Sequence, residues 1–116
     1  MDISVGHTPD SDDAFMFYGM FTDKVPSPDF TVNHVIEDIE NLNLKATNPE
    51  LDVTAVSVHA CAYIPGYTIL RSGGSFGINY GPIVTAKKQM TIEELKKCKI
   101  AIPGKMTSAF LLLQLM

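Results

Sequence analysis

The sequence predicts an α/β fold with a mostly parallel β-sheet and helices on its faces. Runs typical of strands alternate with runs typical of helices along most of the 116 residues. Turn signals such as Thr8-Pro9-Asp10-Ser11 and Pro65-Gly66 separate these runs. Strand–helix–strand repetition is typical of a parallel sheet covered by helices. The chain is long enough for one small domain and too short for two full ones.

The first half of the chain supplies three strands and three helices. Strands are predicted at 3–6, 30–36 and 53–57. Helices are predicted at 12–20, 38–46 and 58–64. Residues 30–36 alternate in polarity like a half-exposed strand, whereas 53–57 reads as a buried one. In the first helix we expect Phe15, Met16 and Tyr18 to face the interior, and Pro26-Ser27-Pro28 ends the segment that follows.

The second half continues the alternation. Strands are predicted at 67–70, 82–86 and 99–103, with a glycine-rich loop at 72–77. Thr91 and Glu94 match a capping box, which predicts the start of a helix. The final helix, from Thr107 onward, is apolar on every side. Such a helix must be buried, so we expect this chain to be a fragment of a larger protein.

Composition and charge narrow the class of protein. The chain is 46% hydrophobic and 19% charged, as in a globular protein, and its formal net charge is −4. Binding to nucleic acid or to an anionic membrane is not expected, because both need clustered Lys and Arg. The lysines between 87 and 105 are attributed to a solvated helix face. Only two cysteines, no secretion signal and no apolar run of about 20 residues together indicate a cytoplasmic protein.

Candidate ligand-binding residues lie where strands end and helices begin. In open α/β sheets, ligands bind beyond the carboxyl ends of the strands. Three segments have this placement: 8–13, 57–60 and 104–108. A helix N-terminus offers free N–H groups and partial positive charge, which suit a carboxylate or another oxyanion. The alternative for Ser57, Thr107 and Ser108 is ordinary capping of their own helices. Glycines in the 72–77 loop either admit a ligand or simply form a turn.

Neither a metal site nor a Cys–His catalytic pair is predicted. Asp10, Asp12 and Asp13 suit a helix cap and first turn, and no His or Cys joins them at a metal-ligand spacing. His59 and Cys61 are two residues apart on a predicted helix, so they point in different directions and cannot act as base and nucleophile. We expect Cys61 to be buried and His59 to form part of a wall.

A series of short motifs runs through the chain in a characteristic order. The segments are 7–18, 37–43, 51–57, 70–74, 81–84 and 101–104. In this order they resemble the 1,4-dihydroxy-6-naphthoate synthase family of the futalosine route to menaquinone, over nearly the whole chain. The resemblance to the sister enzyme, chorismate dehydratase, is weaker at the N-terminus. Many relatives have Asn where Asp12 stands, and a negative charge there bears on which ligand is accepted.

The resemblance implies a type II periplasmic-binding-protein-like fold, in which two α/β lobes close on a ligand. Residues 1–86 would form the first pass through lobe one, and 87–116 the incomplete start of lobe two. The implied reaction is a lyase-type cleavage of cyclic dehypoxanthine futalosine to 1,4-dihydroxy-6-naphthoate, without metal or organic cofactor. The family's substrate-contacting segments match Ala55-Val56-Ser57 and Ser108-Ala109. Its catalytic base is a histidine of lobe two, beyond residue 116, and His59 does not occupy that position.

From these arguments we expect a small anionic substrate. The predicted contact residues are Asp12, Ala55, Val56, Ser57, His59, Ser72, Gly73, Thr107, Ser108 and Ala109. A homodimer is left open. The alternative function is a solute-binding protein of the same fold that holds a small carboxylate or another anion.

Overall fold

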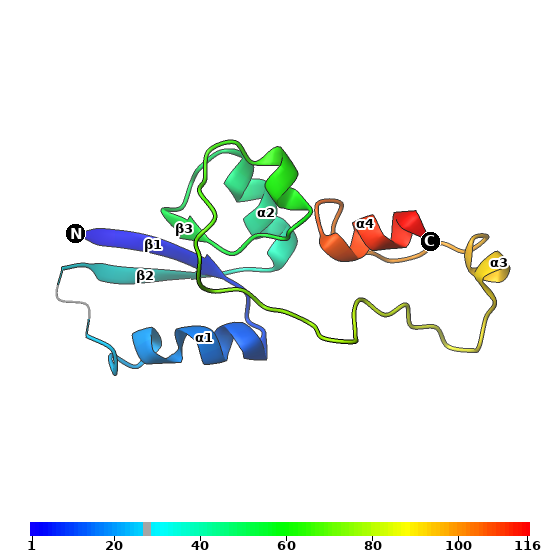
Figure 1. Cartoon of the computed structure of the whole chain (residues 1–116), viewed down its shortest axis with the longest axis horizontal. Helices are drawn as coiled ribbons and strands as arrows, with labels where there is room; N and C mark the ends of the chain where they lie inside the picture. Colours follow the sequence, from blue (N-terminus) through cyan, green and yellow to red (C-terminus); the bar gives the residue numbers. More distant parts are fainter. Residues whose placement is uncertain (27–28) are drawn as a thin grey trace.

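The computed structural model describes residues 1–26 and 29–116 (Figure 1). The elements are β1 (Asp2–His7), α1 (Ser11–Phe21), β2 (Thr31–Ile36), α2 (Ile39–Thr47), β3 (Val53–Thr54), the 3₁₀ helix η1 (Ala60–Tyr63), α3 (Ile92–Leu95) and α4 (Ser108–Leu115). Ser27 and Pro28, part of the predicted break after the first helix, lie outside the described residues.

The three strands form one parallel sheet in the order β2-β1-β3. β1 pairs with β2 along its whole length and with β3 at Val5 and Gly6. The ladder continues past β3, since the Ala55 N–H donates to the Gly6 carbonyl at 2.8 Å. Because parallel strands end at the same edge, the segments after β1, β2 and β3 leave the sheet side by side. The predicted parallel sheet is confirmed.

The helices α1 and α2 cover opposite faces of this sheet. Neighbouring residues of a strand point to opposite faces. The His7 ring lies 4.7 Å from the Phe17 ring of α1, centroid to centroid. A Cβ at Gly6, on the other face, would lie only 2.9 Å from Leu42 of α2. Glycine at position 6 therefore allows α2 to approach the sheet closely.

The first helix is rotated relative to the prediction. Phe15 is 87% exposed and Tyr18 is 51% exposed, so the expected inward orientation of these two residues is wrong. The buried Asp13 carboxylate accepts hydrogen bonds from the Thr8 N–H at 2.6 Å and the Thr8 hydroxyl at 2.8 Å. This anchor turns the stripe at 13, 17 and 21 toward the sheet, because residues four apart share a helix face. Phe17 and Phe21 thus pack where Phe15 and Tyr18 were expected.

The apolar core is small and lies mainly between the sheet and α2. Its buried apolar residues are Val5, Leu42, Ala46 and Ala60. The predicted helix at 58–64 is the shorter 3₁₀ helix η1, and the predicted buried strand at 53–57 is reduced to the half-buried β3. Residues 55–57 leave the ladder because they turn into the segment that carries Ser57.

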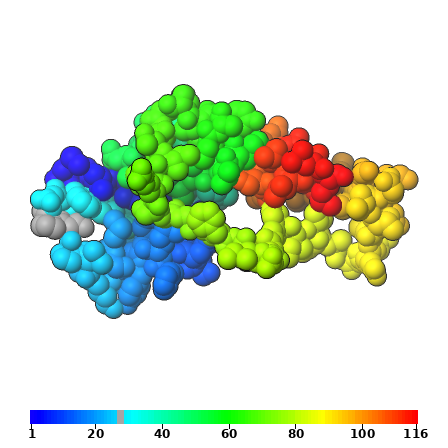
Figure 2. Space-filling view, viewed as in Figure 1, coloured from blue at the N-terminus to red at the C-terminus, as the bar shows by residue number. Residues whose placement is uncertain are grey.

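The strands predicted at 67–70, 82–86 and 99–103 do not form in the described structure. Every residue from 68 to 89 is exposed, and the chain here runs as an extended segment toward α3 (Figures 1 and 2). A strand needs a neighbouring strand to pair its N–H and C=O groups. No described strand lies beside these three segments, so strand-forming residues alone do not produce strands.

The last two helices begin as their sequence signals indicate. The Thr91 hydroxyl oxygen accepts from the Glu94 N–H at 3.2 Å, and the Glu94 carboxylate accepts from the Thr91 N–H at 2.8 Å. The predicted capping box is confirmed. The expected burial of α4 is incomplete: Leu115 is 75% exposed. Among the described residues, no helix is both long and apolar enough to cross a membrane.

Candidate functional site

Two segments far apart in the sequence meet near the carboxyl edge of the sheet. The His59 N–H donates to the Ser108 hydroxyl oxygen at 3.2 Å. The His59 Nδ1 lies 3.2 Å from the Thr107 carbonyl oxygen, and since a carbonyl only accepts, Nδ1 carries the hydrogen. We call Ser57, His59, Thr107 and Ser108 the serine rim. The structure therefore brings together four of the ten predicted contact residues.

Asn43 of α2 holds Ser57 in one orientation. Its side chain is completely buried. Asn43 Oδ1 accepts from the Ser57 N–H at 2.8 Å, and Asn43 Nδ2 donates to Ser57 Oγ at 3.0 Å. Ser57 Oγ therefore uses a lone pair inside the protein. Its own O–H finds no acceptor within hydrogen-bond distance among residues 1–26 and 29–116. Ser57 thus offers a hydrogen-bond donor to its surroundings.

Thr107 and Ser108 open α4 in different ways. Thr107 Oγ1 accepts from the Phe110 N–H at 3.3 Å, and its O–H donates to the Gly104 carbonyl at 2.8 Å. The Thr107 hydroxyl thus acts as the helix cap, which was the alternative to ligand contact. Among residues 1–26 and 29–116, Ser108 Oγ only accepts, from the His59 N–H, so its proton stays free there. Within the described part of the chain, the first N–H groups of α4, at Ser108 and Ala109, have no acceptor.

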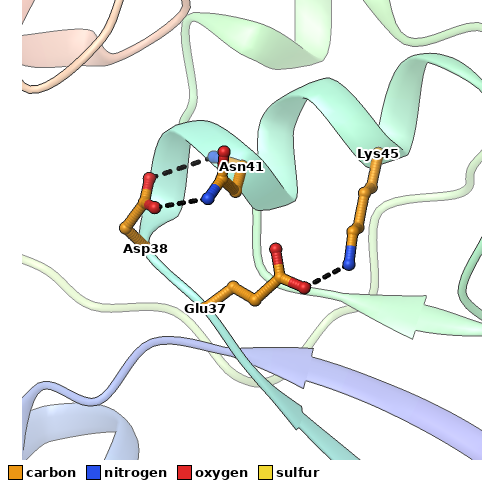
Figure 3. A network of polar contacts seen from close by, with 4 residues as sticks. All are labelled: Glu37, Asp38, Asn41 and Lys45. Atoms are coloured by element: carbon orange, nitrogen blue, oxygen red, sulfur yellow. Dashed lines mark hydrogen bonds and ion pairs between the residues drawn. The ribbon is translucent and has the colours of Figure 1, made fainter.

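A second residue of α2, Glu40, supports the segment before α4. Its carboxylate accepts from the Lys105 N–H at 2.7 Å and from the Met106 N–H at 3.1 Å. The start of α2 is itself fixed by a polar network (Figure 3). There Asp38 accepts from the Asn41 N–H at 3.1 Å and from the Asn41 side chain at 2.7 Å. Glu37, which lies between β2 and α2, pairs with Lys45 in the last turn of α2.

Ala109 follows Ser108 in the first turn of α4, beside the serine rim, and the other five predicted residues do not join the rim. Ala55 and Val56 are half-buried and link β3 to Ser57. Asp12, Ser72 and Gly73 form a second, exposed group near the first turn of α1. Here Ser75 Oγ donates to the Asp12 carboxylate at 2.6 Å. This hydrogen bond lowers the pKa of Asp12. Ser72 and Gly73 belong to the same loop, and Gly73 has a φ of 81°, a conformation that favours glycine. The ten predicted residues therefore fall into two groups.

His59 and Cys61 hydrogen-bond to different partners. The Cys61 Sγ lies 3.6 Å from the Ser57 carbonyl oxygen, whereas His59 points to Thr107. Cys61 is half-buried, so the expectation of a buried thiol is wrong, because the short η1 leaves that side chain partly uncovered. In residues 1–26 and 29–116, no three His, Cys, Asp or Glu side chains are grouped so as to hold a metal ion.

Two histidines, the buried His7 and the half-buried His34, lie on the α1 face of the sheet. His7 is 2% exposed, its Nδ1 lies 3.1 Å from the Thr8 carbonyl oxygen, and its Nε2 lies 3.2 Å from His34 Nδ1. The rings stack on α1, His7 against Phe17 and His34 against Phe21. Burial, and then the neighbouring His7, lower the pKa of His34.

In the serine rim, Thr107 is buried, and Ser57, His59 and Ser108 are half-buried. Two hollows occur elsewhere: one between α3 and the end of α4, the other between the end of α1 and β2. The first is lined almost entirely by apolar side chains and the second has no link to Ser57 or Ser108. The hydrogen-bond donors of the rim therefore indicate a ligand site more strongly than the shape of either hollow does.

Sequence reasoning missed Glu40, Asn43, His7 and His34 as structural partners of the site and the sheet. Asn43 had a signal, because it occupies the buried stripe of α2 with Leu42 and Ala46. A polar residue on such a stripe needs a hydrogen-bond partner. Nothing local indicates which partner it finds.

A comparison with protein families matches residues 3–116 to the family described as menaquinone biosynthesis. This chain belongs to that family. It is 36% identical over 114 residues to 1,4-dihydroxy-6-naphtoate synthase of Thermus thermophilus, covering 97% of this chain and 41% of that protein. The structure resembles the X-ray crystal structure of protein AF1704 from Archaeoglobus fulgidus, with a TM-score of 0.72 and 53% sequence identity. That match covers 77% of this chain and 34% of the other chain.

The predicted family and the α/β class are thus confirmed. The chain spans about two fifths of the length of the curated relative it matches. All four residues of the serine rim lie within residues 3–116, the part of this chain that matches the family.

Proposed function

We propose that the serine rim is part of the substrate site of a 1,4-dihydroxy-6-naphthoate synthase, a lyase that converts cyclic dehypoxanthine futalosine to 1,4-dihydroxy-6-naphthoate. The observation that carries this proposal is the pair of hydroxyls at Ser57 and Ser108. Each accepts a hydrogen bond from the protein, and its proton has no acceptor in the part of the chain that the structure describes. Two such donors suit the acceptor oxygens of a carboxylate. The identity to the Thermus enzyme supports the same assignment.

The start of α4 strengthens the affinity of this rim for an anion. The free N–H groups of Ser108 and Ala109 and the partial positive charge of the helix end act together with the Ser108 hydroxyl. Asp12 acts in the opposite sense, because an exposed aspartate is ionised at neutral pH and repels an anion. The anionic end of the substrate therefore binds at the serine rim, and Asp12, Ser72 and Gly73 face an uncharged part of it.

The remaining parts of the proposal follow the family resemblance. Residues 1–86 belong to lobe one and 87–116 to the start of lobe two, which supplies Thr107 and Ser108 and closes onto lobe one when the ligand binds. The catalytic base is a histidine of lobe two beyond residue 116. His59 instead uses its Nδ1 hydrogen to hold Thr107. We propose a cytoplasmic enzyme that acts on a small anionic substrate, as a monomer or a homodimer.

The test is turnover of cyclic dehypoxanthine futalosine by the full-length protein that contains this chain. We expect 1,4-dihydroxy-6-naphthoate to appear, detected by chromatography, and to form more slowly in the Ser57→Ala variant. Tight binding of the compound without turnover would support the solute-binding alternative instead. If the full-length protein neither binds nor converts the compound, the proposed function is overturned.

A further inference from the structure

A carboxylate from α2 fills the turn that precedes α4. Glu40 accepts hydrogen bonds from the N–H groups of Lys105 and Met106, the two residues just before the helix cap at Thr107. Hydrogen bonds to an ionised carboxylate are stronger than those between neutral groups. Glu40 is 65 residues away from Lys105 in the sequence, so this contact ties the start of α4 to a helix of the first half.

Gly104 is fitted to this carboxylate. A Cβ at position 104 would overlap the Glu40 carboxylate carbon and one of its oxygens. The backbone and the carboxylate are thus in direct contact, and a larger residue at 104 would push Glu40 away from the two N–H groups. Glu40 and Gly104 act as matched parts of one turn.

The same turn contacts the other half of the serine rim. The Thr107 carbonyl and the Ser108 hydroxyl both hydrogen-bond to His59. Asn43, one helical turn after Glu40, holds Ser57. Residues three apart share a helix face. One face of α2 therefore holds both halves of the rim, Ser57 through Asn43 and Ser108 through Glu40.

We propose that Glu40 is a positioning residue of the site, which acts through the backbone of Lys105 and Met106 to fix the Ser108 hydroxyl and the first N–H groups of α4. Glu40 does not touch the ligand. Because its carboxylate occupies the N–H groups of 105 and 106, a ligand anion is directed to those of Ser108 and Ala109. This inference rests on the proposed function.

The test uses calorimetric titration of the full-length protein with 1,4-dihydroxy-6-naphthoate. Glu40→Gln keeps the shape of the side chain and removes its charge, and we expect about tenfold weaker binding, the scale of one hydrogen bond to a charged group. In a Ser108→Ala background the same change should have a smaller effect, because only the N–H contacts of residues 108 and 109 remain to be weakened, whereas in a Ser57→Ala background the tenfold loss should persist. Glu93→Gln, which removes an exposed charge on α3, is the matched control and should leave affinity unchanged.

A second measurement needs no ligand. Amide hydrogen exchange at Lys105 and Met106 should be faster in Glu40→Gln than in the wild type. The neutral amide oxygen accepts more weakly than a carboxylate oxygen, and the NH2 group that replaces the second oxygen cannot accept at all. Should Glu40→Gln fail to fold, Gly104→Ala displaces the carboxylate while keeping its charge, and the same pattern of coupling is expected.

The outcomes separate the two proposals. Faster exchange with unchanged affinity overturns the positioning role and leaves the proposed function standing. An equal loss in the Ser57→Ala and Ser108→Ala backgrounds also overturns it, since the effect would then be general rather than directed through Ser108. No binding of the naphthoate by the wild type overturns the proposed function, and the positioning role with it.

Discussion

At the scale of single residues, Asn43 determines which way the Ser57 hydroxyl points. Asn43→Asp keeps the shape and can still accept from the Ser57 N–H, but it can no longer donate to Ser57 Oγ. The Ser57 proton then turns to the new carboxylate and is lost to the ligand. We expect the full-length variant to bind 1,4-dihydroxy-6-naphthoate about tenfold more weakly in calorimetric titration.

A pH series tests the cause of that loss. A protonated Asp can donate, so the defect of Asn43→Asp relative to the wild type should shrink as the pH falls through the pKa of the introduced carboxyl. Asn33→Asp, which adds the same charge at an exposed position of β2, is the control. A defect that stays constant with pH would contradict a role for the direction of this hydrogen bond.

His34 makes the stability of the fold dependent on pH. Its pKa is lowered in the folded protein by burial and by His7, so the unfolded chain binds a proton more readily. The stabilisation is complete above the ordinary histidine pKa of about 6.5 and is lost as the pH falls below it. His34→Phe keeps an aromatic ring against Phe21 and should flatten this dependence. Urea midpoints measured across the pH range check it, and an unchanged slope in the variant would refute the assignment.

Some residues of the serine rim and its supports could be predicted from the sequence, and others could not, for a physical reason. Ser57, Thr107 and Ser108 could be predicted because a hydroxyl after a strand and before a helix is a local signal. Glu40 and Asn43 could not be assigned, because their partners lie 65 and 14 residues away. Local periodicity shows which face of α2 is buried, but it does not show what lies opposite.

At the scale of elements, the prediction succeeded where local signals suffice. β1, β2, α1 and α2 have clear periodicity, turn residues or caps, and all four form near the predicted bounds. The segments 67–70, 82–86 and 99–103 have strand-like composition but no described partner strand. β-propensity describes how well a residue fits a sheet that already exists, so it could not decide these segments.

Thr107 and Ser108 at the start of α4 should respond differently to mutation. Thr107→Ala removes the cap and should destabilise the protein by about 1 kcal/mol, with or without ligand. Ser108→Ala leaves the cap in place, so it should mainly reduce the rise in melting temperature that 1,4-dihydroxy-6-naphthoate produces. Thermal unfolding of the full-length variants at matched ligand concentration measures both effects. Equal ligand-induced shifts in wild type and Ser108→Ala would leave Ser108 without a role in binding.

At the scale of the whole molecule, this chain is more extended than a compact protein of its length. Its radius of gyration is 16.9 Å, whereas about 13 Å is typical of 116 residues folded as one domain. Its accessible surface is 8933 Å², against about 6,200 Å² for a compact monomer of this mass. Large apolar residues are exposed along the extended segment: Ile69, Leu70, Phe76, Ile78, Tyr80, Ile83 and Val84. Figure 2 shows this segment leading away from the N-terminal part of the molecule.

An exposed apolar segment of this kind predicts how the isolated 116-residue chain behaves. A contiguous exposed apolar surface binds other apolar groups. We therefore expect the isolated chain to bind a hydrophobic dye such as ANS, and the full-length protein to bind much less. We also expect no turnover of cyclic dehypoxanthine futalosine by the isolated chain. The proposed catalytic base, a histidine of lobe two beyond residue 116, is not part of the isolated chain. General-base catalysis requires the base within hydrogen-bond reach of the substrate. Dye fluorescence, small-angle scattering and a product assay on the isolated chain and the full-length protein measure these differences. A chain that is compact near 13 Å, binds no dye and forms 1,4-dihydroxy-6-naphthoate would show that residues 1–116 already contain the complete site.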